Sequence, residues 1–342
     1  MNKQGQLVVA SIGLDHRHMY GQLGGMLEVG AVCKGWWTEG EPKTMAGFVK
    51  RFPDVPRVAD RRELLEDPEV DLVLIAAIPS DRAALAIEAM EHGKDVMSDK
   101  PGATTLEQLA AVRETVARTG RIWSVDFSER FEVRAVTKAV ELVRQGAIGK
   151  VVQTLGIGPH RLNRALRDPW FFDRNQYGGI LCDIASHQID QFLIFTGSET
   201  GEIVSSTVGN FANPDDAGLE DFGEILLRGE NGQGYIRVDW YTPDALPNWG
   251  DGRLFISGTE GYIELRKYVD VAGREGIDHL FLVNGSRYEY IDCSKEPLPY
   301  FQNLADDVRD RTATAMPQEH AFTVTELGIR AQMQAARVGS LR

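Results

Sequence analysis

The sequence has few cysteines, no long apolar run and no surplus of positive charge. Its 342 residues include three cysteines, Cys33, Cys182 and Cys293. An odd number without metal-ligand spacing predicts free thiols in a reducing cytoplasm. No apolar stretch approaches the roughly 18 residues that span a bilayer. The first residues, MNKQGQ, lead directly into an expected strand, so we expect no signal peptide and no membrane segment.

The charge balance disfavours one large class of partner. The net charge is −13, and no stretch is rich in lysine or arginine. Sequence-independent nucleic-acid binding depends on clustered positive charge, so it is disfavoured. We therefore expect a small-molecule partner, and the length predicts two domains.

The first 125 residues alternate apolar runs with helical patterns. Strands are predicted at residues 6–12, 31–37, 70–78, 94–98 and 121–127. A helix is expected from Ser80, as its N-cap, to Gly93, and another over 104–120 between a threonine and a glycine. This order predicts parallel βαβ units, and so a doubly wound α/β domain over residues 1–125.

The remaining residues have a different texture. From about residue 149, strand-like runs follow one another with hairpin-like turns such as RGENGQG. This pattern predicts a second, α+β domain over residues 126–342, with a large, open and mostly antiparallel sheet. Helical segments are expected at its margins, at 178–196 and 299–311. A sheet with helices on one face only needs a partner or a polar coat for the other face. Of these alternatives, we expect a partner, in a homodimer or homotetramer.

The turn after the first strand resembles a phosphate-binding turn imperfectly. In a G-x-G-x-x-G turn, the glycines allow the tight turn, the approach of the pyrophosphate and close helix packing. Gly13 can serve the first purpose, but Asp15 and His18 stand at the other two positions. Asp15 would place a carboxylate near phosphate unless it points away or caps the helix. An ordinary strand–turn–helix is the alternative.

His16 and His18, with Asp15, also raise the question of a metal site. Two histidines and a carboxylate can form a facial ligand set. Residues two apart on a helix do not share a face, however, so we expect no metal here.

Two further patterns have the residue types that acid–base chemistry needs. Lys100 follows a short apolar strand, at the end of a parallel sheet where ligands bind; the alternative is an ordinary surface lysine. Asp183, His187 and Asp190 have the i, i+4, i+7 spacing of one helix face. Histidine suits proton transfer near neutral pH, and a carboxylate can orient it. The alternative is a solvated polar helix face.

These patterns, in this order, resemble the Gfo/Idh/MocA family of NAD(P)-dependent oxidoreductases. The resemblance covers most of the chain and rests on the Gly13 turn, DKP at 99–101, DFSERF at 126–131, GAIGKVV at 146–152 and GGILCDIASHQID at 178–190. It implies an N-terminal Rossmann domain, a C-terminal domain with a large open sheet, and sugars or polyols as substrates.

The resemblance also implies roles for individual residues. Lys100, Asp183 and His187 would be catalytic. The cofactor would bind at Gly13, Asp15, His16, Thr38, Glu39, Ile78, Pro79, Asp99 and Lys100. Substrate contacts would come from Arg161, Trp170, Tyr177, Asp183 and His187, although a solvated polar loop is an equal alternative for the first three.

The chain departs from the family pattern mainly around the cofactor. Asp99 replaces the usual glutamate, Ile78 and Ser80 stand where threonine and asparagine are common, and Ser128 replaces an asparagine. Glu39 would repel the 2′-phosphate of NADP and so favours NAD, whereas the nearby Lys43 weakens this inference.

Three activities are compatible with these residues. The first is hydride transfer between nicotinamide and a hydroxyl carbon of a sugar or polyol. The second is a lyase, epimerase or glycosidase that oxidises its substrate only transiently. The third is a non-catalytic NAD-sensing protein, which the altered glycine motif favours and the retained lysine, aspartate and histidine oppose.

Overall fold

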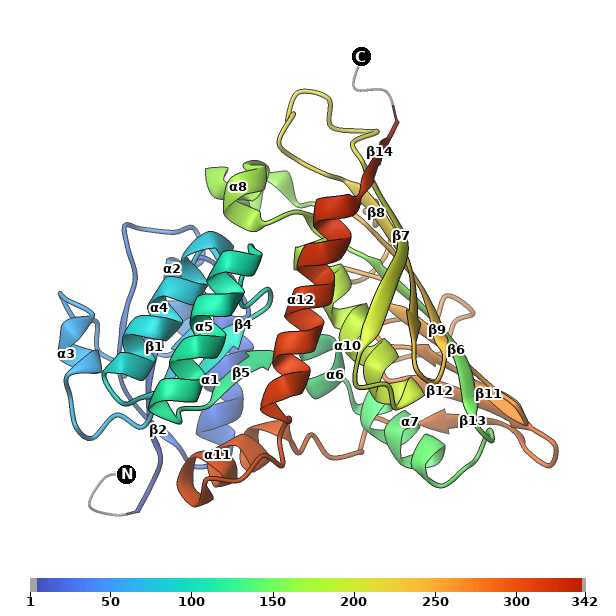
Figure 1. Ribbon diagram of the computed structural model, residues 1–342, viewed down its shortest axis with the longest axis horizontal. Coiled ribbons are helices and arrows are strands. Elements are labelled where there is room, and N and C mark those ends of the chain that lie inside the picture. Colours follow the sequence, from blue (N-terminus) through green and yellow to red (C-terminus); the bar gives the residue numbers. More distant parts are fainter. Residues whose placement is uncertain (1–4, 340–342) are drawn as a thin grey trace. The chain divides into compact units, whose positions relative to one another are not determined.

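The computed structural model describes residues 5–339, and the chain divides into two compact units (Figure 1). The first unit consists of the segment ending at Asp126 together with Ala165–Gly178 and Pro299–Thr325. The second consists of Phe127–Arg164, Gly179–Leu298 and the segment that begins at Glu326. Two later segments thus join the first unit, which the sequence pattern did not predict.

The first unit contains a parallel sheet of five short, buried strands. They are β1 (Val8–Ile12), β2 (Val32–Trp37), β3 (Leu72–Ile75), β4 (Asp95–Asp99) and β5 (Trp123–Asp126). Their order is β2-β1-β3-β4-β5, and every pair is parallel. The predicted Rossmann sheet is therefore confirmed. The strand order reverses between β1 and β3, the place where open α/β sheets bind ligands.

The helices of this unit connect its strands or come from the two later segments. They are α1 (Met19–Glu28), α2 (Met45–Arg51), α3 (Arg62–Leu65), α4 (Pro79–Glu91), α5 (Leu106–Thr119), the 3₁₀ turn η2 (Pro169–Phe172), α8 (Arg174–Tyr177) and α11 (Tyr300–Asp310). Another 3₁₀ turn, η1 (Arg164–Leu166), and α12 (Gln318–Gln334) cross from one unit to the other. A methyl group on Gly25 of α1 would lie 2.4 Å from the Phe301 ring, so this glycine allows α11 to pack closely.

The helix ends agree with the sequence in one helix and differ in another. Thr105 caps α5, where its side chain accepts from the Gln108 N–H, and Gly120 ends the helix with a left-handed φ. The predicted Ser80 cap is wrong, because the N-cap of α4 is Ile78, two residues earlier. Pro79 occupies the first helical position, where the fixed φ of proline favours helix initiation.

The second unit contains a nine-stranded sheet. Its strands are β6 (Val151–Pro159), β7 (Gly201–Gly209), β8 (Phe222–Gly229), β9 (Gln233–Asp239), β10 (Arg253–Gly258), β11 (Gly261–Arg266), β12 (His279–Asn284), β13 (Tyr288–Asp292) and β14 (Ala336–Val338). Their order is β13-β12-β11-β10-β6-β9-β8-β7-β14, and only β6·β9 and β7·β14 are parallel among these pairs. This confirms the mostly antiparallel sheet.

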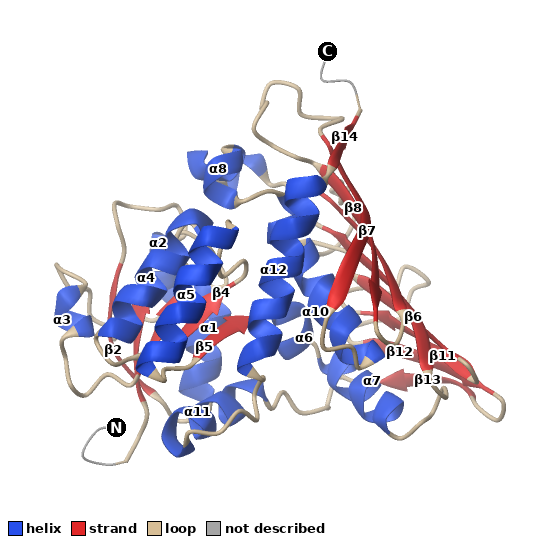
Figure 2. Cartoon of the chain, in the orientation of Figure 1, coloured by secondary structure: helices blue, strands red, loops and turns tan. Residues whose placement is uncertain are grey.

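Helices pack on one face of this sheet (Figure 2). They include α6 (Ser128–Phe131), α7 (Arg134–Arg144), α9 (Ile180–Asp183) and α10 (Ala185–Thr196). Val136 and Ala139 of α7 belong to the same buried apolar cluster as Leu254, Ile263 and Leu280 of the sheet. Alternate strand residues therefore point toward the helices.

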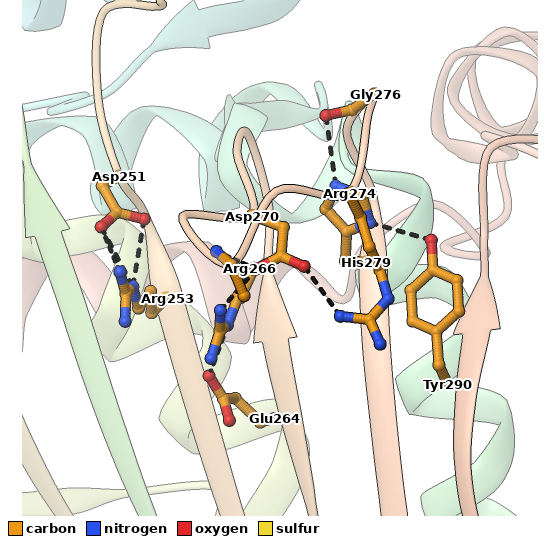
Figure 3. Close-up of polar contacts among 10 residues, drawn as sticks. Asp251, Arg253, Glu264, Arg266, Asp270, Arg274, Gly276, His279 and Tyr290 are labelled. Carbon is orange, nitrogen blue, oxygen red and sulfur yellow. Dashed lines mark hydrogen bonds and ion pairs between the residues drawn. The ribbon is translucent and has the colours of Figure 1, made fainter. Parts of the chain in front are cut away.

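No described helix covers the other face of the large sheet (Figure 2). Partly exposed apolar side chains alternate with the buried ones, and Phe255 stacks on Tyr262 with ring centroids 4.9 Å apart. A charged network lies near the ends of β10–β12 (Figure 3). Its centre is Asp270, which accepts from Arg266 at 2.5 Å and Arg274 at 3.0 Å. Although burial alone would raise the Asp270 pKa, the hydrogen bonds from the Ala272 N–H and the two arginines lower it.

Among the helices of residues 5–339, none combines the length and the apolar character that a membrane crossing requires.

Candidate active site

The turn after β1 is closed by hydrogen bonds to the neighbouring strands. Gly13 has φ +78°, and its N–H donates to the Trp37 carbonyl at 2.8 Å. A methyl group here would lie 2.5 Å from the Ala77 side chain, so only glycine fits. The Leu14 N–H donates to the Thr38 hydroxyl at 3.0 Å, and the His16 N–H donates to the Ala76 carbonyl. The predicted Gly13 and Thr38 therefore lie in one turn, with the Thr38 hydroxyl holding it.

His16 and His18 both contact one buried carboxylate. The Asp99 side chain, at the end of β4, lies 3.0 Å from His16 Nδ1 and 2.7 Å from His18 Nδ1. Because α1 begins at Met19, both histidines precede the helix, and their rings meet edge-on at 4.2 Å. The argument that kept these two residues apart is therefore wrong, since it assumed a helix across both.

Arg82 completes this cluster from α4. Its side chain is fully buried, lies 2.9 Å from Asp99 Oδ2 and donates to the carbonyls of Ala77 and Lys100. Burial alone would raise the Asp99 pKa, but the charge of Arg82 and the two histidines lower it well below its usual value. Burial lowers the His16 pKa to about 3. At neutral pH, Asp99 is therefore ionised and His16 is neutral.

Sequence reasoning missed Arg82, although a signal was present. Arg82 stands four and seven residues before Ala86 and Ala89, both fully buried, on the apolar face of α4. A single charge on such a face indicates a buried ion pair.

Of the described side chains, His16, His18 and Asp99 form the set whose ligand atoms are close enough to hold a metal ion. The distances between these atoms are those of hydrogen bonds, and Arg82 places a positive charge on the same carboxylate. A further cation there would meet that charge. The cluster thus fits a hydrogen-bonded ion pair better than a metal site.

Asp15 lies in the same turn without capping the helix. The N-cap position of α1 is His18, and no side chain caps the helix there. Burial raises the pKa of Asp15 to about 6, against the opposing charge of Arg82. Near neutral pH this carboxyl is largely ionised, yet it loses its charge in mild acid.

A hollow of about 510 Å³ follows β2. Its lining includes Thr38, Glu39 and Arg57. Lys43 is held elsewhere, because its ammonium group donates to the carbonyls of Ala165 and Arg167. The charged side chains that line the hollow are thus Glu39 and Arg57.

Lys100 and the following residues occupy the end of β4. Lys100 is 3% exposed, which is inconsistent with an ordinary surface lysine. Its carbonyl accepts from Arg82, and Pro101 follows through a cis peptide bond. Ile78 and Pro79 lie at the beginning of α4, the helix that carries Arg82.

The Asp183–His187–Asp190 pattern lies on two short helices rather than one. Gly178 and Gly179, both at positive φ, precede α9; Asp183 ends α9, and α10 begins after Ile184. The three side chains are at most 7% exposed. A solvated polar face is therefore excluded.

Asp190 has a structural partner. Arg130 of α6 donates to both of its carboxylate oxygens at 2.7 Å. On the same helix, the side chains of Gln188 and Gln191 bond to Glu129, whose carboxylate lies 2.6 Å from the Lys267 ammonium group. These buried contacts fix α10 and leave Asp183 and His187 as the candidates for chemistry in this unit.

The predicted substrate contacts are divided between the two units. Arg161 donates to the carbonyls of Pro243 and Leu246, both at 2.7 Å, and so holds that loop. Trp170 and Tyr177 belong to the first unit, are buried, and lie beside Phe171. Their contact with substrate stays a prediction.

Comparison with known proteins gives matches in both halves of the chain. Residues 40–127 match the model of the oxidoreductase family with an NAD-binding Rossmann fold. Residues 136–264 match the GFO/IDH/MocA C-terminal domain.

Two curated dehydrogenases are similar in sequence to different shares of this chain. Levoglucosan dehydrogenase of Pseudarthrobacter phenanthrenivorans is 29% identical over 206 residues, 59% of this chain and 52% of that protein. The chain thus spans about half the length of this relative. The scyllo-inositol 2-dehydrogenase (NAD(+)) of Bacillus subtilis is 29% identical over 287 residues, 80% of this chain and 77% of that one.

Solved structures agree over nearly the whole length. A protein of Erwinia carotovora atroseptica SCRI1043, provisionally described as an oxidoreductase, is 45% identical with a TM-score of 0.94, covering 98% of this chain and 100% of that one. Levoglucosan dehydrogenase in complex with NADH and levoglucosan shares the fold, with a TM-score of 0.76 at 21% identity over 96% of this chain and 97% of that one. By its two domain matches and its 45% identical relative, the chain belongs to the Gfo/Idh/MocA family of oxidoreductases.

Proposed function

We propose that this protein is an NAD-dependent oxidoreductase that oxidises a hydroxyl carbon of a sugar or polyol. The observation that carries the proposal is the burial of Asp183 and His187 on α9 and α10, with Lys100 buried at the end of β4. Burying an ionisable side chain costs free energy of folding. Side chains that are buried despite this cost are typical of catalytic sites. Relatives named as dehydrogenases of levoglucosan and scyllo-inositol support the substrate class.

The side chains divide the reaction between them. When bound, NAD would supply the acceptor for the hydride that leaves the carbon bearing the reacting hydroxyl. The hydroxyl proton passes to His187, which Asp183 orients. Lys100 donates a hydrogen bond to the same oxygen and stabilises its developing negative charge. General acid–base assistance of this kind accounts for about 10²–10⁴ in rate.

The residues of the first unit fit NAD. The open-sheet switch point, the glycine at Gly13 and the hollow beside Glu39 are features of a dinucleotide site. Glu39 disfavours the 2′-phosphate of NADP, and Lys43 is engaged by two carbonyls and does not offset it. We assign cofactor binding to residues 1–125, and substrate binding and oligomerisation to residues 126–342.

The cell compartment and the assembly belong to the same proposal. The three cysteines are free thiols, which suits the cytoplasm. The helix-free face of the large sheet suits a homodimer or homotetramer.

The test is NADH production by the purified protein on a panel that includes levoglucosan, scyllo-inositol and myo-inositol. Lys100→Met and His187→Asn should each lower kcat by about 10²–10⁴-fold, because each removes a group that handles the reacting proton or oxygen. Lys150→Met and His92→Asn are matched controls at exposed positions.

The outcomes separate the possible activities. Product formation without net NADH would indicate transient oxidation, as in a lyase or epimerase. NAD binding without turnover on any member of the panel would favour an NAD-sensing protein. Full activity of both catalytic-site variants would disprove the assigned roles.

A further inference from the structure

The short helix that ends at Asp183 is fastened by two side chains from distant parts of the chain. The Ile180 N–H donates to Glu220 Oε2 at 3.1 Å, and the Leu181 N–H donates to Gln332 Oε1 at 2.9 Å. The first N–H groups of a helix have no partner within the helix, so these bonds satisfy two of them. Glu220 comes from the segment before β8, and Gln332 from α12.

The two side chains also bond to each other. Gln332 Nε2 donates to both oxygens of Glu220, at 3.2 and 3.0 Å. Glu220 is 3% exposed and Gln332 is 7% exposed. Arg337 approaches Glu220 Oε1 only to 3.9 Å, with a largely exposed side chain. The carboxylate and the amide thus form one buried pattern of donors and acceptors.

The surroundings of this pair are rigid. The neighbouring Asp221 accepts from the N–H groups of Phe211 and Ala212 at 2.8 Å, and its own N–H donates to Gly209. This fixes the backbone that carries Glu220.

Close packing also holds α9. A methyl group on Gly223 of β8 would lie 2.6 Å from Leu181 Cδ2 and 2.8 Å from Ile180 Cγ2. On α12, a methyl group on Gly328 would lie 3.5 Å from the Leu181 carbonyl oxygen. The helix is therefore held by β8 and by α12 as well as by the two side chains.

We propose that Glu220 and Gln332 are positioning residues that set the orientation of α9, and through it Asp183. This role rests on the proposed function of Asp183 and His187. Asp183 is the last residue of a four-residue helix, so a rotation at Ile180 and Leu181 moves its carboxylate directly. Small misplacements of a catalytic group cost rate more than they cost substrate binding.

Exchanging the two side chains tests this role, because the exchange keeps the pattern of donors and acceptors while each single substitution breaks it. In Glu220→Gln, two amide NH₂ groups face each other and compete for too few acceptor oxygens. In Gln332→Glu, two carboxylates face each other and repel. The double variant E220Q/Q332E restores the pattern, because the new amide can donate to the new carboxylate while both backbone N–H groups keep acceptors. Glu224→Gln is the matched control, since Glu224 lies on β8 but bonds to Thr207 and Tyr235 instead.

The variants are compared by steady-state kinetics and by amide hydrogen exchange. We expect kcat to fall about 5-fold in Glu220→Gln and 10- to 100-fold in Gln332→Glu, with KM for NAD unchanged, as one buried polar group loses its partner. In the double variant, kcat should return to within about 3-fold of the wild type. Amide hydrogen exchange of residues 180–184 should accelerate in each single variant and recover in the double variant, whether or not a substrate is known.

The outcomes keep the two proposals apart. Single variants that lose thermal stability but keep wild-type kcat and local exchange would overturn the positioning role, as would failure of the double variant to recover. Full activity of Asp183→Asn would instead disprove the role proposed for Asp183 in the reaction, on which this inference rests.

Discussion

At the scale of the residue, Asp15 is the most unusual feature of the nucleotide turn. In a G-x-G-x-x-G turn, the residue at this position is a glycine that lets the pyrophosphate of a bound dinucleotide approach the backbone. Because burial raises its pKa to about 6, a small change of pH changes its charge. Above that pH the carboxylate repels phosphate, and below it the neutral acid does not.

NAD affinity should therefore depend on pH through this one side chain. We expect the Kd for NAD to rise about fivefold to tenfold as the pH increases from about 5 to about 7.5, by calorimetric titration. Asp15→Asn should bind NAD more tightly than the wild type at the higher pH and show little pH dependence. Asp54→Asn, an exposed position, is the control. A flat wild-type profile would show that the Asp15 carboxylate points away from the phosphates.

The sequence predicted the conformation of a single turn correctly, but it did not predict which side chains would form contacts with each other. Gly13 could be placed correctly, because a tight turn after a strand needs a left-handed residue. The Arg82–Asp99 pair and the two histidines could not, because they depend on how α4 and the end of β4 face each other. Lys100 was proposed from its place after a short strand and His187 from its helical spacing, whereas their burial came only with the structure.

At the scale of the element, α10 is a buried helix that carries several polar side chains. Its charge is balanced by one bidentate contact, between Asp190 and Arg130. A buried carboxylate that loses its cation, or a cation that loses its carboxylate, pays the cost of desolvation without compensation.

Breaking this pair should destabilise the protein strongly. We expect Asp190→Asn to lower the free energy of unfolding by about 3–5 kcal/mol, measured by urea denaturation. Glu319→Gln, which removes the exposed partner of Arg113, should cost less than about 1 kcal/mol. Similar small losses for both variants would contradict a structural role for the buried pair.

The spacing of apolar residues gave one wrong prediction about helix length. A single helix over 178–196 was expected, but the structure has two, divided at Ile184. A one-residue interruption leaves the apolar periodicity almost unchanged, so the pattern could not reveal it.

At the scale of the whole molecule, the helix-free face of the large sheet is the candidate contact between copies. Tyr262 is 37% exposed and stacks on Phe255, and further partly exposed apolar residues lie on neighbouring strands. The charged network around Asp270 lies near the strand ends (Figure 3). Apolar contacts with polar groups nearby are typical of protein interfaces.

Tyr262→Lys should shift the assembly toward monomers, because it would bury a charge between two sheets. Light scattering after size-exclusion chromatography measures the mass directly. Val49→Lys, at an exposed apolar position on α2, should leave the mass unchanged. A wild-type protein that is already monomeric at micromolar concentration would disprove the expected oligomer.

The discontinuous first unit has a consequence for biosynthesis. Tyr300 and Gln318 bond to β5, and Phe301 packs against Gly25, yet these residues are made long after the strands they complete. At a translation rate of about 5–20 residues per second, the sheet that ends at Asp126 waits roughly ten to forty seconds until Thr325 has been added. During that interval, the apolar surface of the nascent nucleotide-binding sheet lacks its final cover. Because exposed apolar surface promotes aggregation, we expect chaperones to bind this segment during synthesis.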